Sequence, residues 1–142
     1  MDTNRTGDQD IVQSLYTQVL SQTTAPDLTE RMARVLAPGW ESIGDYSGAK
    51  KSREQFGAQL AGFGKLIPDL TWKIEEVIAS GDRYVVRGRA SGTPVGPLFG
   101  VGPTGKRFEI LSIDIHTVEG GKVVRTWHVE DWAGALRQLA AG

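Results

Sequence analysis

The sequence has no cysteine, which excludes disulfide bonds, thiolate nucleophiles and cysteine-ligated metal sites. It also lacks an excess of either charge, because 16 lysines and arginines stand against 17 aspartates and glutamates. A nucleic-acid-binding surface needs a basic excess, so we expect no nucleic acid partner. No apolar run approaches the roughly 20 residues of a membrane-spanning helix, and the N-terminus lacks the basic and apolar regions of a signal peptide. These absences predict a cytoplasmic protein with no membrane partner.

The residues that are present suffice for one globular domain. The chain has 142 residues, of which 39% are hydrophobic, and this size supports one hydrophobic core rather than two. Residues 1–9 are polar and without periodicity, and we predict that they form a disordered leader. Residues 10–142 are predicted to form the single domain.

Three segments in the N-terminal half carry apolar residues at helical spacing. They cover residues 11–20, residues 28 to about 36, and residues 52–66. Each has a residue at its start that can accept a hydrogen bond from the first helical turn, namely Asp10, Asp27 and Ser52. We therefore predict three helices.

From Leu70 onward the apolar period changes from about 3.6 to 2, which indicates strands. Residues 70–78 and 83–91 are predicted to form one hairpin, and residues from about 107 to 130 a second. Residues 40–47 are predicted to be an edge strand or an ordered loop. Helices that precede a set of antiparallel strands predict the α+β class.

Two further segments flank the second hairpin. Residues 92–105 are rich in glycine and proline but include four large apolar side chains, so we predict that they fold over a pocket as a lid. Residues 132–140 are predicted to form a short C-terminal helix capped by Asp131.

The second hairpin holds both histidines, and its turn allows two registers. A two-residue loop at Gly120-Gly121 sets Asp114 opposite Trp127 and turns His128 to the other face of the sheet. Asp114 and His128 then never meet.

A three-residue loop with a G1 bulge sets Ser112 opposite His128 and Asp114 opposite Thr126. The polar and apolar side chains then separate onto two faces. The polar face holds Ser112, Asp114, His116, Thr126, His128 and Glu130, and the apolar face holds Leu111, Ile113, Ile115, Val123, Trp127 and Val129. Because a half-buried sheet needs consistent faces, we prefer this register, which brings Asp114 and His128 into diagonal proximity.

Asp114 and His128 are the candidate catalytic pair. At the bottom of an apolar pocket, burial raises the pKa of a carboxyl and lowers that of an imidazole, while their mutual attraction opposes both effects. Such a pair suits proton transfer near neutral pH. The alternative is a purely structural contact within the sheet.

For the remaining polar and aromatic residues, a structural or surface role is an alternative to a functional one. His116 is interpreted as a solvated or cross-strand residue and Glu130 as a rim charge. Substrate contacts are predicted for Ser112 and Thr126 on the polar face. Trp40, Trp72 and Phe99 fit the core and substrate stacking equally well. The two histidines and Asp114 lack the close spacing of a metal site, and no phosphate-binding glycine motif follows a strand, so no metal or cofactor is expected.

Several short motifs carry a family resemblance: Pro68-Asp69-Leu70, the Gly-Pro-Thr-Gly at 102–105, the Gly121-Lys122 turn, and Asp131-Trp132 with the final Leu-Arg-Gln-Leu. Over about residues 11–139 the chain resembles the SnoaL-like polyketide cyclase, or ester cyclase, family. This family shares the superfamily of nuclear transport factor two and ketosteroid isomerase. The resemblance implies a cone-shaped barrel, in which a curved antiparallel sheet packs on three N-terminal helices with a short C-terminal helix. It also implies a homodimer through the outer face of the sheet.

Members of that family close a ring by intramolecular aldol condensation of a polyketide ester without metal or cofactor. Their acidic residue on the last strand falls on His128, and their histidine on the preceding strand falls on Asp114, so the two residue types are exchanged here. We prefer Asp114 as base and His128 as acid. Ser42 and Trp40 fall where the family contacts its ligand, and the expected substrate is a small hydrophobic carbonyl compound. The alternatives are an isomerase or dehydratase that resembles ketosteroid isomerase, and a binding protein without catalysis.

Overall fold

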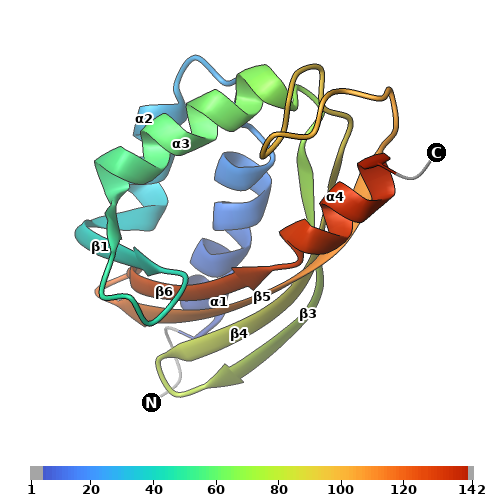
Figure 1. Ribbon diagram of the computed structural model, residues 1–142. Helices are drawn as coiled ribbons and strands as arrows, with labels where there is room; N and C mark the ends of the chain where they lie inside the picture. The colour runs from blue at the N-terminus through green and yellow to red at the C-terminus, as the bar shows by residue number, and fades with distance from the viewer. Residues whose placement is uncertain (1–4, 141–142) are drawn as a thin grey trace.

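A curved six-stranded sheet wraps around the N-terminal helices in the computed structural model, which describes residues 5–140 (Figure 1). Along the chain the elements are α1 (Arg5–Ser14), η1 (Leu15–Leu20), α2 (Leu28–Val35), β1 (Leu36–Ile43), β2 (Lys51–Ser52), α3 (Arg53–Leu66), β3 (Thr71–Ser80), β4 (Arg83–Gly92), β5 (Phe108–Glu119), β6 (Lys122–Glu130) and α4 (Trp132–Ala140). α1, α2 and α3 lie on the concave side of the sheet, and α4 closes one end. The predicted α+β class and the packing of a curved sheet on three helices are confirmed.

The helices follow the predicted segments closely, with two corrections. α1 begins at Arg5, so Asp10 lies inside the helix and is not its cap. Residues 5–9 of the predicted leader are therefore helical, and its residues 1–4 lie outside the described part of the chain. Their helical turns were missed because these residues carry no apolar periodicity. The Asp27 side chain does not cap α2 but pairs with Arg31 at 2.8 Å.

The cap of α3 behaves as predicted. The Ser52 side chain accepts a hydrogen bond from the Gln55 backbone at 3.1 Å, and the Gln55 side chain accepts one from the Ser52 backbone at 2.8 Å. This capping box satisfies two of the backbone groups that a helix start leaves free.

The sheet departs from the expected barrel in two ways. Its strand order is β2-β1-β6-β5-β4-β3, and its two edges do not meet, so it is a curved open sheet. β1 pairs in parallel with β6, which makes the sheet mixed rather than wholly antiparallel. Of the segment predicted as an edge strand or loop at 40–47, residues 40–43 belong to β1 and residues 44–47 form the loop after it. β1 is not an edge strand, because it lies inside the sheet between β2 and β6.

The β5–β6 hairpin has a register that neither expected loop describes. Its turn is the two-residue one, with Glu119 opposite Lys122, and both turn glycines have positive φ, at 60° and 78°, as a type I′ turn needs. A β-bulge at Val124 then adds one residue to β6 between the Val118 and Thr117 pairs. As a result Asp114 lies directly opposite His128, and not opposite Thr126 as the preferred register predicted.

The separation of the two faces survives this correction. The inner face holds the six polar side chains that were predicted for it, and on the outer face Leu111 and Val129 are exposed by 53% and 60%. Val123 is the exception: it was predicted on the outer face but is fully buried, because the bulge beside it reverses the alternation at that point.

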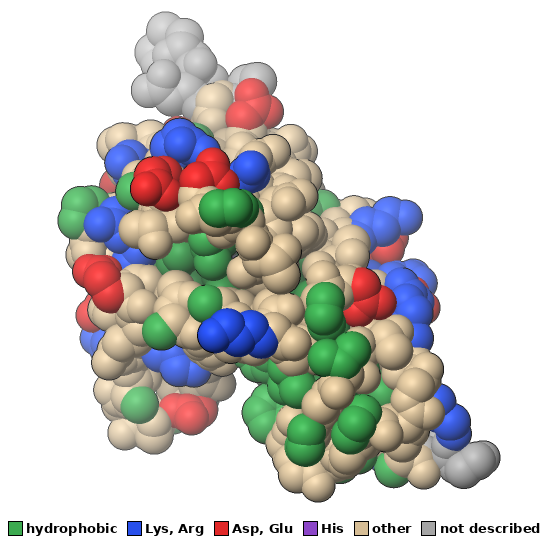
Figure 2. All heavy atoms as spheres, turned by 90° about the horizontal axis from the view of Figure 1, so that it is seen from above, with side chains coloured by type: hydrophobic (Ala, Val, Ile, Leu, Met, Phe, Trp, Pro, Cys, Tyr) green, Lys and Arg blue, Asp and Glu red, His purple; other side chains and the backbone are tan. Residues whose placement is uncertain are grey.

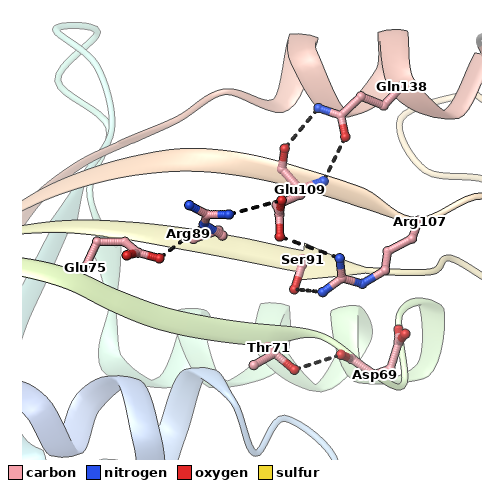
Figure 3. A network of polar contacts seen from close by, with 8 residues as sticks. All are labelled: Asp69, Thr71, Glu75, Arg89, Ser91, Arg107, Glu109 and Gln138. Atoms are coloured by element: carbon pink, nitrogen blue, oxygen red, sulfur yellow. Dashed lines mark hydrogen bonds and ion pairs between the residues drawn. The ribbon is translucent and has the colours of Figure 1, made fainter.

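Of the predicted lid at residues 92–105, Gly92 ends β4, and the remaining residues 93–105 are held together with α4 at one end of the sheet. Leu98 is almost fully buried and packs in a cluster with Phe108, Ala135 and Leu139. On the outside, the Gln138 side chain donates to the Glu109 carbonyl and accepts from its N–H, at 3.0 and 2.8 Å (Figure 3). Asp131 caps α4 as predicted, since its side chain accepts from the Gly134 N–H at 2.9 Å.

The view from above shows charges of both signs interspersed and no histidine on that face (Figure 2). That face therefore offers no basic patch. Among the described residues, no helix is long and apolar enough to cross a bilayer.

Candidate functional site

A cavity of about 70 Å³ lies between the concave face of the sheet and the helices. Its walls are apolar side chains, chiefly Leu15, Leu20, Phe56, Leu60, Phe63, Leu70, Trp72 and Trp132. Its polar lining comes mostly from β5 and β6 and comprises Ser42, Gln59, Asp114, His116, Thr126, His128 and Glu130. An apolar chamber with a few convergent polar groups is typical of a small-molecule site.

Asp114 lies on the floor of this cavity and is 4% exposed. Its Oδ2 accepts a hydrogen bond from the Tyr16 hydroxyl at 2.5 Å. Within residues 5–140 no group hydrogen-bonds to Oδ1, and no fully buried polar side-chain atom lacks a partner, so Oδ1 reaches open space in the cavity. Burial raises the pKa of Asp114 to about 7, although the hydrogen bond from Tyr16 works in the opposite direction. The carboxyl can therefore both release and accept a proton near neutral pH.

His128 lies opposite Asp114 on β6 and is partly accessible, with 28% of its side chain exposed. Its Nδ1 lies 2.7 Å from the Glu130 carboxylate, which also accepts a hydrogen bond from the Trp132 indole at 3.2 Å. The hydrogen bond with Glu130 raises the pKa of His128, against the effect of burial. The contact with Glu130 therefore favours the protonated form of the imidazole.

Asp114 and His128 thus share a face and a cavity, as the sequence predicted, although no hydrogen bond joins them in the described structure. Each is held by a different partner, Tyr16 for the carboxylate and Glu130 for the imidazole. Glu130 was interpreted as a rim charge, and its contact with His128 corrects that interpretation. The Asp114 carboxyl, which can accept a proton, and the His128 imidazole, which can donate one, therefore face the same cavity. Acid/base chemistry needs this arrangement.

His116 was interpreted as a solvated or cross-strand residue. It is not solvated, since it is 1% exposed, but it is a cross-strand residue, because it lies opposite Thr126 on β6. Its Nε2 lies 2.7 Å from the Tyr16 hydroxyl, and its Nδ1 lies 2.8 Å from the Thr126 hydroxyl. Burial lowers its pKa to about 3, so the imidazole is neutral. Thr126 in turn accepts from the Trp40 indole at 3.0 Å.

The predicted substrate-binding residues divide into two groups. Trp40, Ser42, Trp72 and Thr126 line the cavity. Ser112 lies beneath it, fully buried, and accepts a hydrogen bond from the Trp72 indole at 3.0 Å. Phe99 is 58% exposed on the lid; its ring contacts Phe63 and Trp132, at centroid distances of 6.5 and 5.7 Å, rather than the cavity itself.

Tyr16 is the functional candidate that the sequence did not reveal. In the sequence Tyr16 is one of several apolar positions on an amphipathic helix. Its two polar partners, Asp114 and His116, follow 98 and 100 residues later. Tyr16 lies on η1, which is a π-helical segment. The N–H of Ser21 donates to the Tyr16 carbonyl, five residues back, at 3.0 Å. Such segments are frequent at functional sites, but nothing in the local sequence marks this one.

A metal site finds no support in the described part of the chain, where no group of three or more His, Asp or Glu side chains has a suitable arrangement. The polar groups of the cavity are instead bonded to one another. The arrangement can accept a proton at Asp114, donate one at His128, and hold an apolar molecule between them.

Known proteins resemble this chain in sequence and in fold. A family model described as SnoaL-like polyketide cyclase matches residues 10–139. Among curated proteins, none matches the sequence.

Solved structures share the fold over nearly the whole chain. A SnoaL-like polyketide cyclase candidate from Jannaschia sp. CCS1 is 24% identical and superposes with a TM-score of 0.81, covering 96% of this chain and 94% of that one. TsrD from Streptomyces laurentii is also 24% identical, with a TM-score of 0.81 and coverage of 97% and 98%. IdmH from Streptomyces antibioticus, a polyketide cyclase candidate, is 25% identical, with a TM-score of 0.81 and coverage of 94% and 99%. The resemblance seen in the sequence is thereby confirmed, and the chain belongs to the SnoaL-like polyketide cyclase family.

Proposed function

We propose that the protein is a cofactor-independent polyketide (ester) cyclase that closes a ring by intramolecular aldol condensation. The observation that carries this proposal is the position of Asp114, a buried carboxyl with a pKa of about 7 whose Oδ1 faces an apolar cavity beside His128, an imidazole whose pKa is raised by the hydrogen bond with Glu130. Membership of the cyclase family supports the same reaction class.

In this reaction Asp114 acts as the base. Ionised Asp114 takes a proton from a methylene group flanked by two carbonyls, so the C–H bond breaks and an O–H bond forms on the carboxyl. The resulting enolate carbon attacks a second carbonyl carbon of the same molecule, and a carbon–carbon bond closes the ring. The apolar walls exclude water, which strengthens the electrostatic stabilisation of the enolate.

His128 acts as the acid. Its Nδ1 is bonded to Glu130, so Nε2–H is the group left to deliver a proton to the oxygen that becomes an alcohol. The cycle ends with Asp114 protonated and His128 neutral, and exchange of protons with solvent restores both. The partial exposure of His128 provides the route for this exchange.

Asp114→Asn and His128→Gln test the proposal on a panel of aromatic and aliphatic polyketide esters. Both variants should bind ester with nearly unchanged Kd while kcat falls by about 10²-fold or more, the usual contribution of a general acid or base. Ile113→Val, on the outer face of the same strand, is the matched control and should keep its rate. Wild-type turnover in both site variants would refute the acid/base roles, and ester binding without turnover by the wild-type protein itself would favour the non-catalytic binder.

We also propose that the substrate is a small hydrophobic carbonyl compound and that two chains associate through the outer face of the sheet. Large apolar side chains are exposed there on β5 and β6, namely Leu111, Ile115, Trp127 and Val129. Several neighbouring charges are paired with one another, since Arg89 pairs with Glu75 and with Glu109 at 3.1 and 3.2 Å (Figure 3). A second copy of this face could therefore cover the apolar strip while these ion pairs stay intact.

Light scattering coupled to size exclusion tests this association. Ile115→Lys should change the mass from two chains to one, whereas Val95→Lys, at an exposed apolar site on the lid, should leave it at two. A monomeric wild type would refute the dimer. The cytoplasmic location stays a prediction.

A further inference from the structure

A chain of four hydrogen bonds runs along the wall of the cavity from Trp40 to the proposed base. The Trp40 indole, the Thr126 hydroxyl, the His116 ring, the Tyr16 hydroxyl and the Asp114 carboxyl follow one another at 3.0, 2.8, 2.7 and 2.5 Å. The bonds shorten steadily toward the carboxyl. Such shortening is expected when the acceptor at one end is charged and neighbouring bonds polarise one another.

The direction of every bond in this chain follows from its two ends. An indole N–H can only donate, and an ionised carboxylate can only accept. The Tyr16 hydroxyl must therefore donate its single proton to the hydrogen bond with Asp114. In the hydrogen bond between Tyr16 and His116 the donor must then be Nε2–H of His116. A neutral imidazole has no second N–H, so its Nδ1 must accept the Thr126 proton. Four donors serve four bonds, and only one arrangement satisfies them all.

We propose that this chain of hydrogen bonds positions the base. It keeps the His116 proton on Nε2 and directs the Tyr16 hydroxyl to donate to Asp114 Oδ2. Oδ1 is then the atom that takes the proton from the substrate. His116, Thr126 and Trp40 act through Tyr16, which does not line the cavity. The inference rests on the proposed function only in naming a substrate as the source of the proton that Oδ1 takes. The hydrogen-bond direction itself is a property of the resting protein.

The charged surroundings are consistent with this assignment. Asp114 is faced by Tyr16 from η1 and by His128 and Glu130 from β6. His116 keeps a neutral ring, because burial lowers its pKa and the nearby His128 adds to that effect. Burial and the charge of Asp114 hold the pKa of Tyr16 well above its usual value, so the phenol keeps the proton that it donates.

The first experiment is ¹⁵N NMR of the two histidine rings in the wild-type protein at a pH above the titration of Asp114. We expect His116 to show a protonated Nε2 and an unprotonated Nδ1, and to keep a neutral ring while His128 titrates. A protonated Nδ1, or a charged ring, would overturn the proposed direction. This readout needs no substrate, so it stands or falls independently of catalysis.

The second experiment follows the ¹³C signal of the Asp114 carboxyl during a pH titration of variants. Tyr16→Phe removes the bond that lowers the pKa of Asp114, so its midpoint should rise by about 1 pH unit. His116→Gln keeps a donor near the Nε2 position and should shift the midpoint little, whereas His116→Asn loses that donor and should shift it upward. Equal midpoints in the wild type and Tyr16→Phe, or in the Gln and Asn variants, would contradict a positioning role for these two residues.

The two proposals fail separately. If the tautomer and the midpoints are as expected but no ester is turned over, the cyclase assignment is wrong and the positioning chain remains. If esters are turned over but His116 carries its proton on Nδ1, the chain is wrong and the cyclase assignment remains.

Discussion

Replacing Asp114 with asparagine should make the protein more stable at neutral and alkaline pH, even though it removes the proposed base. Burial raises the pKa of Asp114 to about 7 in the folded protein, whereas an aspartate in an unfolded chain has a pKa of about 3.9. Between these values the folded state keeps a proton that the unfolded state has released. The free energy of unfolding therefore falls as the pH rises through this window.

The size of the effect follows from the same two values. A pKa difference of about 3, at about 1.4 kcal/mol for each unit, corresponds to about 4 kcal/mol above pH 7. Asparagine is neutral at every pH, and its oxygen can still accept the hydrogen bond from Tyr16. Its buried amide N–H groups cost about 1 kcal/mol. We therefore expect the Asp114→Asn variant to be slightly less stable than the wild type at about pH 4 and about 3 kcal/mol more stable at about pH 8.

Urea denaturation followed by tryptophan fluorescence at a series of pH values measures this difference. Asp10→Asn is the control, because Asp10 is exposed on α1, and its effect should stay within about 0.5 kcal/mol at every pH. A stability difference for Asp114→Asn that does not change with pH would show that the folded protein does not suppress the ionisation of Asp114.

Two further variants probe His128. At Gly44 an added Cβ would lie 3.1 Å from both Cε1 and Nε2 of His128, so Gly44→Ala should displace the imidazole and lower kcat by about 10-fold or more. Gly39→Ala, within β1 and with nothing within 4 Å of the added Cβ, should leave kcat unchanged. Equal effects of the two substitutions would contradict this placement of the imidazole. Glu130→Gln should lower the pKa of His128, because the hydrogen bond with Glu130 is the main cause that raises it. The alkaline limb of the pH–rate profile should then move to lower pH, and an unmoved limb would mean that His128 is not the acid.

The fold could be predicted from the sequence wherever local patterns decide the structure. The capping residue Ser52, the period change at Leu70 and the cap at Asp131 placed α3, β3 and α4 within a residue or two. These signals depend only on neighbours in the chain. The parallel pairing of β1 with β6 has no such signal, since it joins residues more than 80 positions apart.

The candidate site was predictable in part. Alternation along β5 and β6 was enough to place Asp114 and His128 on one face, even though the assumed loop was wrong. The bulge at Val124 compensates for the two-residue turn, and nothing in the local sequence distinguishes the bulged Val124 from its neighbour Val123. Tyr16 and the buried state of His116 depend on how α1 and η1 pack on the sheet, which is a tertiary property that no local pattern contains.

Hydrogen–deuterium exchange tests the central claim most directly, because it detects proton abstraction without requiring ring closure. A β-keto ester that binds the cavity is incubated in D₂O, and the loss of its methylene proton signal is followed by NMR. If Asp114 is the base, the wild-type protein accelerates exchange well beyond the buffer rate, and Asp114→Asn, which still binds the ester, does not. Equal acceleration by the two proteins would contradict the assignment of Asp114 as the base.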